Sequence, residues 1–342
     1  MGTENFGDGE FWGRRILGTE ISLSPLTVLI FSDIYITMEN LKRYNRLTEY
    51  LKEKFGERVL KICIDGGFTC PNRDGTTGFG GCIFCSETGS GDHMIHNKDI
   101  SNQIKNYFLS YKSSRANKFI AYFQNFTNTY DSIENLKRKY DSALIDDRIV
   151  ALAIATRPDC INEDIVKLLH SYTSKYYVWV ELGLQTSNDE TGRLINRGYS
   201  SKQFTKAVAL LNKYNIDVVT HIMVGLPGES ESDLKNTVSF INSHNIQGIK
   251  IHSTYVIKNT ILAQMYYNEL YKPLTLDEYL NSVVYILTHI PKNIIIHRIS
   301  GDAPKNLLIA PDWNSHKKLI LNGVDKIMKE NNLWQGCHIS NF

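Results

Sequence analysis

The sequence lacks the features that would place the chain in or across a membrane. The apolar stretch 21–36 is interrupted by Pro25 and Asp33, and it is too short and too polar to span a bilayer. It follows Arg14 and Arg15, as the core of a secretory signal would, but no small-residue cleavage site comes after it. We therefore expect no membrane association, and we expect a cytoplasmic protein.

The sequence also lacks a strong charge of either sign. Its 38 lysines and arginines nearly balance 36 acidic residues, which gives a formal net charge of +2. Any nucleic acid would therefore be bound by local basic patches, such as 137–139, rather than by a global field. Apolar residues make up 42% of the chain, as in an ordinary globular protein, so a core that excludes water from a site is feasible.

Cysteine is scarce but unevenly placed. Six are present, and three of them, Cys70, Cys82 and Cys85, fall within 16 residues. Such bunching indicates metal binding in a reducing compartment rather than a disulfide framework. Eight glycines crowd the segment 64–91, and glycine permits the positive φ and close backbone approach that a chain wrapped round a compact inorganic cluster requires.

Three thiolates suit an iron–sulfur cluster with one open iron better than a structural zinc site, which needs four ligands. Zinc stays an alternative if Cys63 or His93 supplies the fourth ligand. Cys63 lies in an apolar strand pattern, so we expect it to pack in the core, and His93 could equally be an ordinary loop residue.

From residue 59 the chain alternates between short β-rich runs and helical patterns. This alternation indicates right-handed crossovers and a parallel sheet, and the absence of a linker favours one full or partial barrel. The expected fold is α/β, a partial (open) parallel β/α barrel. Strands are predicted over 59–65, 118–124, 149–155, 176–184, 217–224, 248–256 and 293–299, and helices over 100–112, 133–141, 163–171, 200–214, 231–245 and 275–289.

An amphipathic helix is predicted over 41–55, directly after Met38. We expect Met38 to be the natural start, with residues 1–37 either upstream read-through or a poorly ordered extension. One domain is then expected over 38–335, followed by a tail, 336–342.

Several sequence blocks resemble one known family. The block 68–85, FTCPNRDGTTGFGGCIFC, resembles the signature of a bacterial radical S-adenosylmethionine (SAM) family, the group that contains YhcC and YtqA. That group is related to the radical SAM domain of the elongator catalytic subunit. Similar blocks follow in order: AYFQNFTNTY (121–130), IATRPDC (154–160), ELGLQT (181–186), HIMVGLPGE (221–229), IKIHSTYVIKNT (249–260) and RISGDAPKNLLIAPDW (298–313). The resemblance implies an open barrel of the radical SAM type.

The resemblance also implies the cofactors and the groups that hold them. Cys70, Cys82 and Cys85 would bind a [4Fe–4S] cluster, and its open iron would bind the amino and carboxylate groups of SAM. Phe84 would pack near the adenine, although a generic core role suits it equally. The family fold implies an acidic segment for the SAM amino group where Gln124 and Asn125 stand here, so these two are weaker candidates.

Further SAM contacts are implied on the following strands. Glu181 and Gln185 lie on one face of a strand and would approach the ribose hydroxyls. Arg157 would bind the SAM carboxylate, with an ion pair to Asp159 as an equally good interpretation. Gly225 would allow the backbone to approach the adenine. The catalytic residue that controls the substrate radical is not identified.

The substrate and partners rest on resemblance alone. Members similar to YtqA act on the wobble uridine of tRNA, removing the carboxymethyl part of its carboxymethylaminomethyl group. The resemblance therefore implies the tRNA anticodon loop as substrate and flavodoxin or ferredoxin as electron donor. His252, His297 and Arg298 are weak candidates for substrate contacts. Two alternatives stay open: a radical SAM enzyme with a small-molecule substrate, and a zinc-stabilised nucleic-acid-binding module without catalysis.

Overall fold

A computed structural model describes residues 42–87, 89 and 99–339. Seven parallel strands form one sheet, and each pairs with the next along the chain in the order β1-β2-β3-β4-β5-β6-β8. The two outer strands do not pair with each other, so the barrel is open, as predicted. The strands of this sheet are β1 (Val59–Ile64), β2 (Lys118–Phe123), β3 (Ile149–Thr156), β4 (Tyr177–Gln185), β5 (Asp217–Val224), β6 (Gly248–Ser253) and β8 (Ile295–Arg298).

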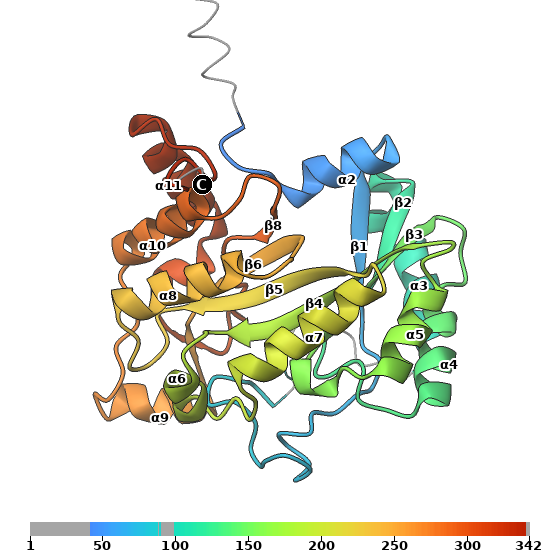
Figure 1. The fold of residues 1–342 in the computed structure, drawn as a ribbon, viewed down its shortest axis with the longest axis horizontal. Helices are drawn as coiled ribbons and strands as arrows, with labels where there is room; N and C mark the ends of the chain where they lie inside the picture. The colour runs from blue at the N-terminus through green and yellow to red at the C-terminus, as the bar shows by residue number, and fades with distance from the viewer. Residues whose placement is uncertain (1–41, 88, 90–98, 340–342) are drawn as a thin grey trace, which may run out of the picture. The chain divides into compact units, whose positions relative to one another are not determined.

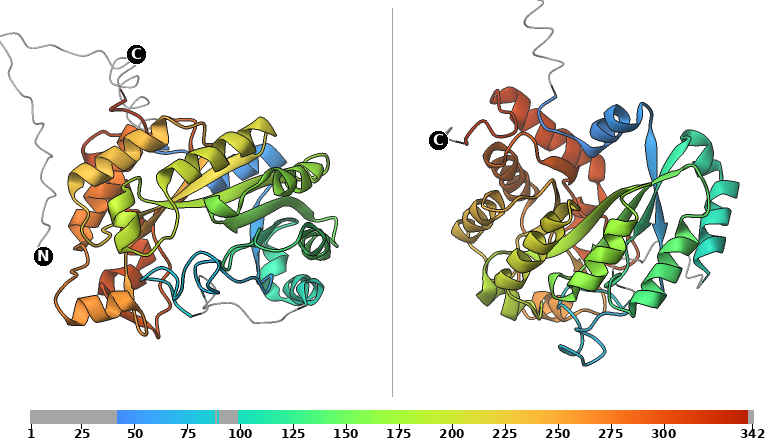
Figure 2. Two further views of the ribbon diagram at one scale, coloured as in Figure 1. Left: turned by 60° about the horizontal axis from the view of Figure 1, so that its bottom comes forward. Right: turned by 45° about the vertical axis from the view of Figure 1, so that its right-hand side comes forward.

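Most helices cover the outer face of the curved sheet (Figure 2), whereas Leu47 and Leu51 of the helix before β1 pack against inner-face residues such as Ile120. Several begin at a capping box, in which a Ser or Thr side chain and the third helical residue bond each other's backbone N–H; Thr275 and Glu278 form one. The helices are α2 (Leu47–Phe55), α3 (Ile100–Leu109), α4 (Ile133–Ala143), α5 (Glu163–Ser171), α6 (Asp189–Leu194), α7 (Ser201–Lys213), α8 (Glu231–Asn242), α9 (Ile261–Tyr267), α10 (Leu276–His289) and α11 (Lys317–Glu330).

The two faces of the sheet carry different side chains because successive residues of a strand point to opposite sides. On β2, Phe119 and Phe123 join the large core beneath the helices, whereas Ile120 and Tyr122 belong to a smaller cluster on the inner face. Trp179 is the bulkiest member of that inner cluster and is fully buried. The inner face therefore has its own apolar floor.

Several element boundaries differ from the prediction. The helix expected over 41–55 begins at Leu47, because Arg46 forms a bridge to Ile296 of β8 instead of entering the helix. The strand expected over 248–256 is two strands: β6 ends at Ser253, and β7 (Val256–Ile257) pairs antiparallel with β9 (Leu308–Ala310). Local periodicity could not show this change of partner.

The predicted extension, 1–37, and the proposed start at Met38 lie outside the described residues. The compact unit that carries the sheet spans 43–342. Within the described part of the chain, no helix is both long and apolar enough to cross a membrane.

Candidate active site

A cavity of about 1190 Å³ opens on the inner face of the half-barrel. The cysteine loop after β1 contributes to its wall, and residues of all seven strands of the sheet line it together with residues of several helices. Figure 1 shows this loop, in blue to teal, emerging where the strands end. Small inner-face residues such as Ala155 and Gly183 keep the space open. A Cβ on Gly183 would lie 2.8 Å from the Gln185 amide nitrogen, too close for a real contact.

The three cysteines of the loop all line this cavity, as the sequence predicts. They are free thiols, and burial together with the neighbouring Cys85 raises the pKa of Cys82. Forming thiolates there therefore requires a compensating positive group, which a metal supplies. Arg157 provides part of this charge, with its Nη1 3.9 Å from Cys70 Sγ.

Three thiolates leave a structural zinc site one ligand short, whereas a [4Fe–4S] cluster can be held by three and keep one iron open. Within the described ranges, no three His, Cys, Asp or Glu side chains gather closely enough to hold one metal ion. Thiolates that each bind a different iron of a [4Fe–4S] cluster stand further apart than ligands of one zinc. His93, the possible fourth zinc ligand, lies outside the described residues.

The expectation that Cys63 packs in the core is wrong. Its side chain is exposed and lines the cavity, whereas its neighbours Ile62 and Ile64 are buried. The alternation of β1 turns Lys61 and Cys63 to the inner face of the barrel. An apolar strand pattern alone does not reveal that one face of the strand borders a cavity.

The cysteine loop is fixed to the segment that follows α6. Asn72 donates its side-chain N–H to the carbonyl of Asn196 at 2.5 Å, and Asn196 donates back to the carbonyl of Gly81 at 2.8 Å. The backbone N–H of Ile83 also donates to Ile195. These bonds hold the loop against the carboxyl end of β4.

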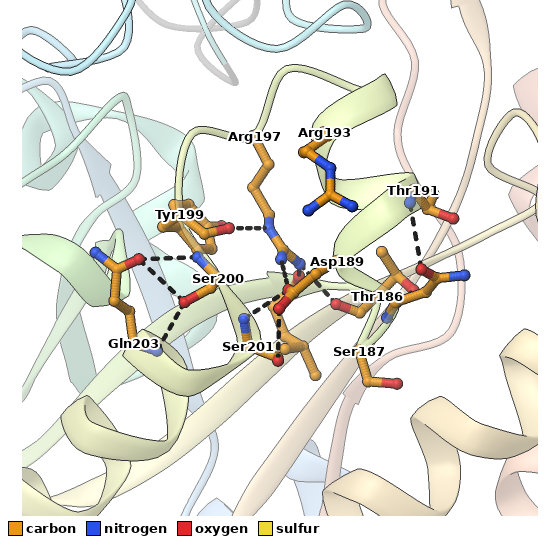
Figure 3. Close-up of polar contacts among 12 residues, drawn as sticks. Thr186, Ser187, Asp189, Thr191, Arg193, Arg197, Tyr199, Ser200, Ser201 and Gln203 are labelled. Carbon is orange, nitrogen blue, oxygen red and sulfur yellow. Dashed lines mark hydrogen bonds and ion pairs between the residues drawn. The ribbon is translucent and has the colours of Figure 1, made fainter.

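The side chain of Arg197 bonds several groups at the carboxyl end of β4 (Figure 3). Sequence reasoning did not identify this residue. Its fully buried guanidinium donates to the carbonyls of Leu184 and Thr186 at 2.6 Å each, to the carbonyl of Tyr199 and to Asp189. A planar fork with five donors suits this task, and lysine could not replace it. The conformation of β4 around residue 185 is thereby fixed.

Gln185 sits between the two carbonyls that Arg197 holds, and it lines the cavity. Its backbone has φ 64°, a conformation that a non-glycine residue adopts only at a cost of about 1–3 kcal/mol. Such strain is typical of functional positions. The predicted contact of Gln185 with SAM is consistent with this placement.

The other predicted SAM residues divide into two groups. Phe84 and Gln124 line the cavity with the thiols. Asn125 and Gly225 do not, although the buried Asn125 amide has no hydrogen-bond partner among the described residues. Gly225 has φ 82° and packs against Leu274, so it serves the turn after β5. The SAM contacts of all four stay predictions.

Arg157 makes the ion pair that was one of its two interpretations. Two of its nitrogens donate to the carboxylate of Asp159 at 2.9 and 2.7 Å, and Nη1 donates to the carbonyl of Arg197. Both ion-pair partners are about nine-tenths buried. These bonds hold the guanidinium beside Cys70, and a contact with the SAM carboxylate stays a prediction.

Glu181 is completely buried at mid-strand, deeper in the barrel than Gln185. Its carboxylate accepts hydrogen bonds from Tyr122 Oη at 2.7 Å, from Trp179 Nε1 at 3.1 Å, from His221 Nε2 at 2.9 Å and from Lys250 Nζ. Both oxygens thus have partners within the protein. The predicted ribose contact is untested, and the structure gives Glu181 a second role as counterion.

Burial and the neighbouring charges shift the pKa values of Glu181 and of the basic residues around it. Burial alone would raise the pKa of Glu181, but Lys250 and Lys61 lower it well below the usual range. Burial lowers the pKa of Lys250 to about 7 and that of His221 to about 4. His221 is therefore neutral at physiological pH and donates its Nε2 proton to the carboxylate.

Sequence reasoning missed the two lysines that face Glu181. Lys61 and Lys250 each interrupt an apolar strand pattern, and a lysine at a buried strand position is a usable signal. His252, His297 and Arg298, which were weak candidates, do line the cavity.

Comparison with known proteins identifies the relatives of this chain. Residues 70–241 match the radical SAM superfamily, and residues 246–330 match the radical SAM C-terminal domain. YtqA of Bacillus subtilis is 40% identical over 299 residues, which cover 86% of this chain and 92% of YtqA. YhcC of Escherichia coli is 33% identical over 294 residues, covering 86% of this chain and 94% of YhcC.

More distant similarity reaches tRNA-modifying proteins. A tRNA uridine(34) acetyltransferase of Methanocaldococcus infernus is 32% identical over 166 residues, 47% of this chain and 30% of that protein. The solved structure of Elp3 from the same organism has a TM-score of 0.62 and 22% identity, covering 81% of this chain and 64% of that one. This structural likeness shows the fold alone.

Proposed function

The chain belongs to the radical SAM superfamily, in the group of YtqA and YhcC, and we propose that this radical SAM enzyme acts on the wobble uridine of tRNA. Family membership excludes the non-catalytic zinc module and gives the enzyme a [4Fe–4S] cluster and SAM as cofactors. When bound, these cofactors supply a 5′-deoxyadenosyl radical that removes a hydrogen atom from the substrate.

The observation that carries the substrate proposal is the similarity to tRNA uridine(34) acetyltransferases. The aligned segment is only 30% of the acetyltransferase, so acetyl transfer itself is not part of the proposal. From the acetyltransferases we transfer to this chain only the proposed substrate, uridine 34 of tRNA. Such a base could enter the cavity, because single-stranded loops can splay nucleotides into pockets.

We propose that the reaction converts a carboxymethylaminomethyl group to an aminomethyl group. The carboxymethyl carbon would lose a hydrogen atom to the 5′-deoxyadenosyl radical, which becomes 5′-deoxyadenosine. Further oxidation of that carbon and addition of water would then break its bond to nitrogen. The balance consumes one SAM and one water, and it releases methionine, 5′-deoxyadenosine, glyoxylate and a proton. The two electrons taken from the carbon reduce SAM, so no further oxidant is required.

The protein's own residues prepare this chemistry. Cys70, Cys82 and Cys85 would hold the cluster, and Arg157 would offset the thiolate charge. Arg197 fixes the strained end of β4, which presents Gln185 to SAM. We further propose a cytoplasmic reaction, because tRNA and a small electron donor such as flavodoxin or ferredoxin are available there.

The test is direct. Cluster-loaded enzyme, SAM and a reductant are incubated without oxygen with tRNA that carries the carboxymethylaminomethyl group. Nucleoside mass spectrometry should show aminomethyluridine, with glyoxylate and 5′-deoxyadenosine in equal amounts. The Cys70→Ala variant is the negative control. SAM cleavage with bound but unchanged tRNA would refute the substrate and favour a small molecule.

A further inference from the structure

The walls of the cavity carry an unusual excess of positive charge. Its described lining includes eight lysines and arginines but only two carboxylates, Glu181 and Asp302. Arg46 and Arg157 have acidic partners outside the lining, Asp325 and Asp159. Of the other cations, Lys61, Lys250 and Arg298 lie on β1, β6 and β8, and Lys317 begins α11.

Four cations share the two carboxylates there. Lys250 and Lys61 both face Glu181, with Lys61 Nζ at 3.9 Å, beyond hydrogen-bonding distance. Arg298 and Lys317 share Asp302, at 2.5 and 3.4 Å. SAM cannot balance this excess, because its sulfonium adds another positive charge.

Lys61 is the least satisfied of these cations. Among the described residues its Nζ otherwise lies near only the rings of Tyr122, at 5.0 Å, and Trp179, at 6.0 Å. Its side chain is 25% exposed, and it lines the cavity. Three ammonium donors are thus available to an oxygen ligand.

Two imidazoles beside the lysines also have free polar atoms. His252 Nε2 and His297 Nδ1 are buried and have no hydrogen-bond partner among the described residues. The His297 side chain is 96% buried, and both residues line the cavity. Buried polar atoms ordinarily have a partner, so these two indicate a ligand in this part of the cavity.

We propose that Lys61, together with Lys250, Arg298 and the two histidines, forms a subsite for the carboxylate of the substrate. The inference rests on the proposed function, in which that carboxylate belongs to the carboxymethyl group. The cluster cysteines line the same cavity, so we expect a carboxylate held here to place the adjoining carbon toward the SAM site. Lys61 acts as a specificity-determining residue.

Binding of small probes tests the subsite apart from tRNA. Cluster-loaded enzyme with SAM but without reductant, which prevents turnover, is titrated with 5-carboxymethylaminomethyluridine and with its methyl ester, which lacks the carboxylate charge but keeps the amine. One charge-assisted hydrogen bond contributes about tenfold or more in affinity, so wild type should prefer the free acid by at least this factor. Equal affinities, or no measurable binding of the acid, would overturn the subsite.

Lys61→Gln should abolish the preference for the acid and leave SAM affinity unchanged. Lys175→Gln is the matched control, because Lys175 also lies over a tyrosine ring, 5.3 Å from Tyr176, with a carboxylate 4.0 Å away, but on the surface. It should bind both probes as wild type does. If Lys61→Gln instead weakened SAM, the cations would belong to the SAM site and the proposal would fail.

A second variant covers the case in which Lys61→Gln folds poorly. Arg298→Gln should also reduce the preference for the acid, since it removes another cation of the subsite. Retention of the full preference in both folded variants would refute the proposal. Discrimination between the probes combined with unaltered tRNA would refute the proposed function and leave the carboxylate subsite standing.

Discussion

The buried pair of Glu181 and Lys250 gives the sharpest stability prediction. Each partner is almost inaccessible, with side-chain exposures of 0% and 6%. Removing one partner of such a pair costs about 3–5 kcal/mol, because the other charge is left buried without compensation. We therefore expect Glu181→Gln and Lys250→Met each to lower the free energy of unfolding by about this amount near pH 6.

The double variant should recover most of the loss, since replacing both buried charges with neutral groups of similar size is often close to neutral. The measurement is anaerobic urea unfolding of the cluster-loaded proteins. With a slope of about 3 kcal/mol per molar urea, each single variant should shift the midpoint by roughly 1 M or more. Single variants within 1 kcal/mol of wild type, or a double variant as costly as the two singles summed, would contradict the reasoning.

The same pair sets a pH dependence. Burial lowers the pKa of Lys250 to about 7, below its value of about 10.4 in the unfolded chain. Between those values the unfolded chain binds more protons, so this lysine makes wild-type stability rise with pH. The cost of Glu181→Gln should fall as pH rises through the folded pKa of about 7, because a neutral Lys250 needs no counterion. A cost that stays constant from pH 6 to 9 would contradict the assignment.

The remaining predictions concern the cluster, the end of β4 and the chain start. Alanine at any one of the three cluster cysteines should abolish the cluster's visible absorption and SAM cleavage, whereas Cys63→Ala should retain both; the reverse pattern would show that the ligands are wrongly assigned. Arg197→Lys should weaken SAM binding at least about tenfold with the cluster intact, because lysine cannot hold all four acceptors; unchanged SAM affinity in calorimetry would exclude that role. A chain that begins at Met38 should keep its iron content and activity, and an insoluble product would show that the preceding residues are required.

The sequence by itself determined the type of fold and predicted the cluster ligands. Both signals are local: Cys70, Cys82 and Cys85 lie within 16 residues, and strand–helix alternation repeats along the chain. The strand–helix alternation then implied crossover connections and a parallel sheet, which the structure has. The sequence also indicated that Gln185, at a strand end, would face the site, which the cavity lining supports.

Only the tertiary structure decided which polar side chains meet on the inner face of the sheet. Tyr122 and Lys250 bond each other across 128 residues of sequence, and Glu181 joins them from another strand. Curvature of the sheet brings these side chains together, and periodicity within one strand carries no information about it. For the same reason the sequence placed Cys63 in the core: its strand is apolar, but its inner face borders a cavity that exists only once seven strands have curled round it.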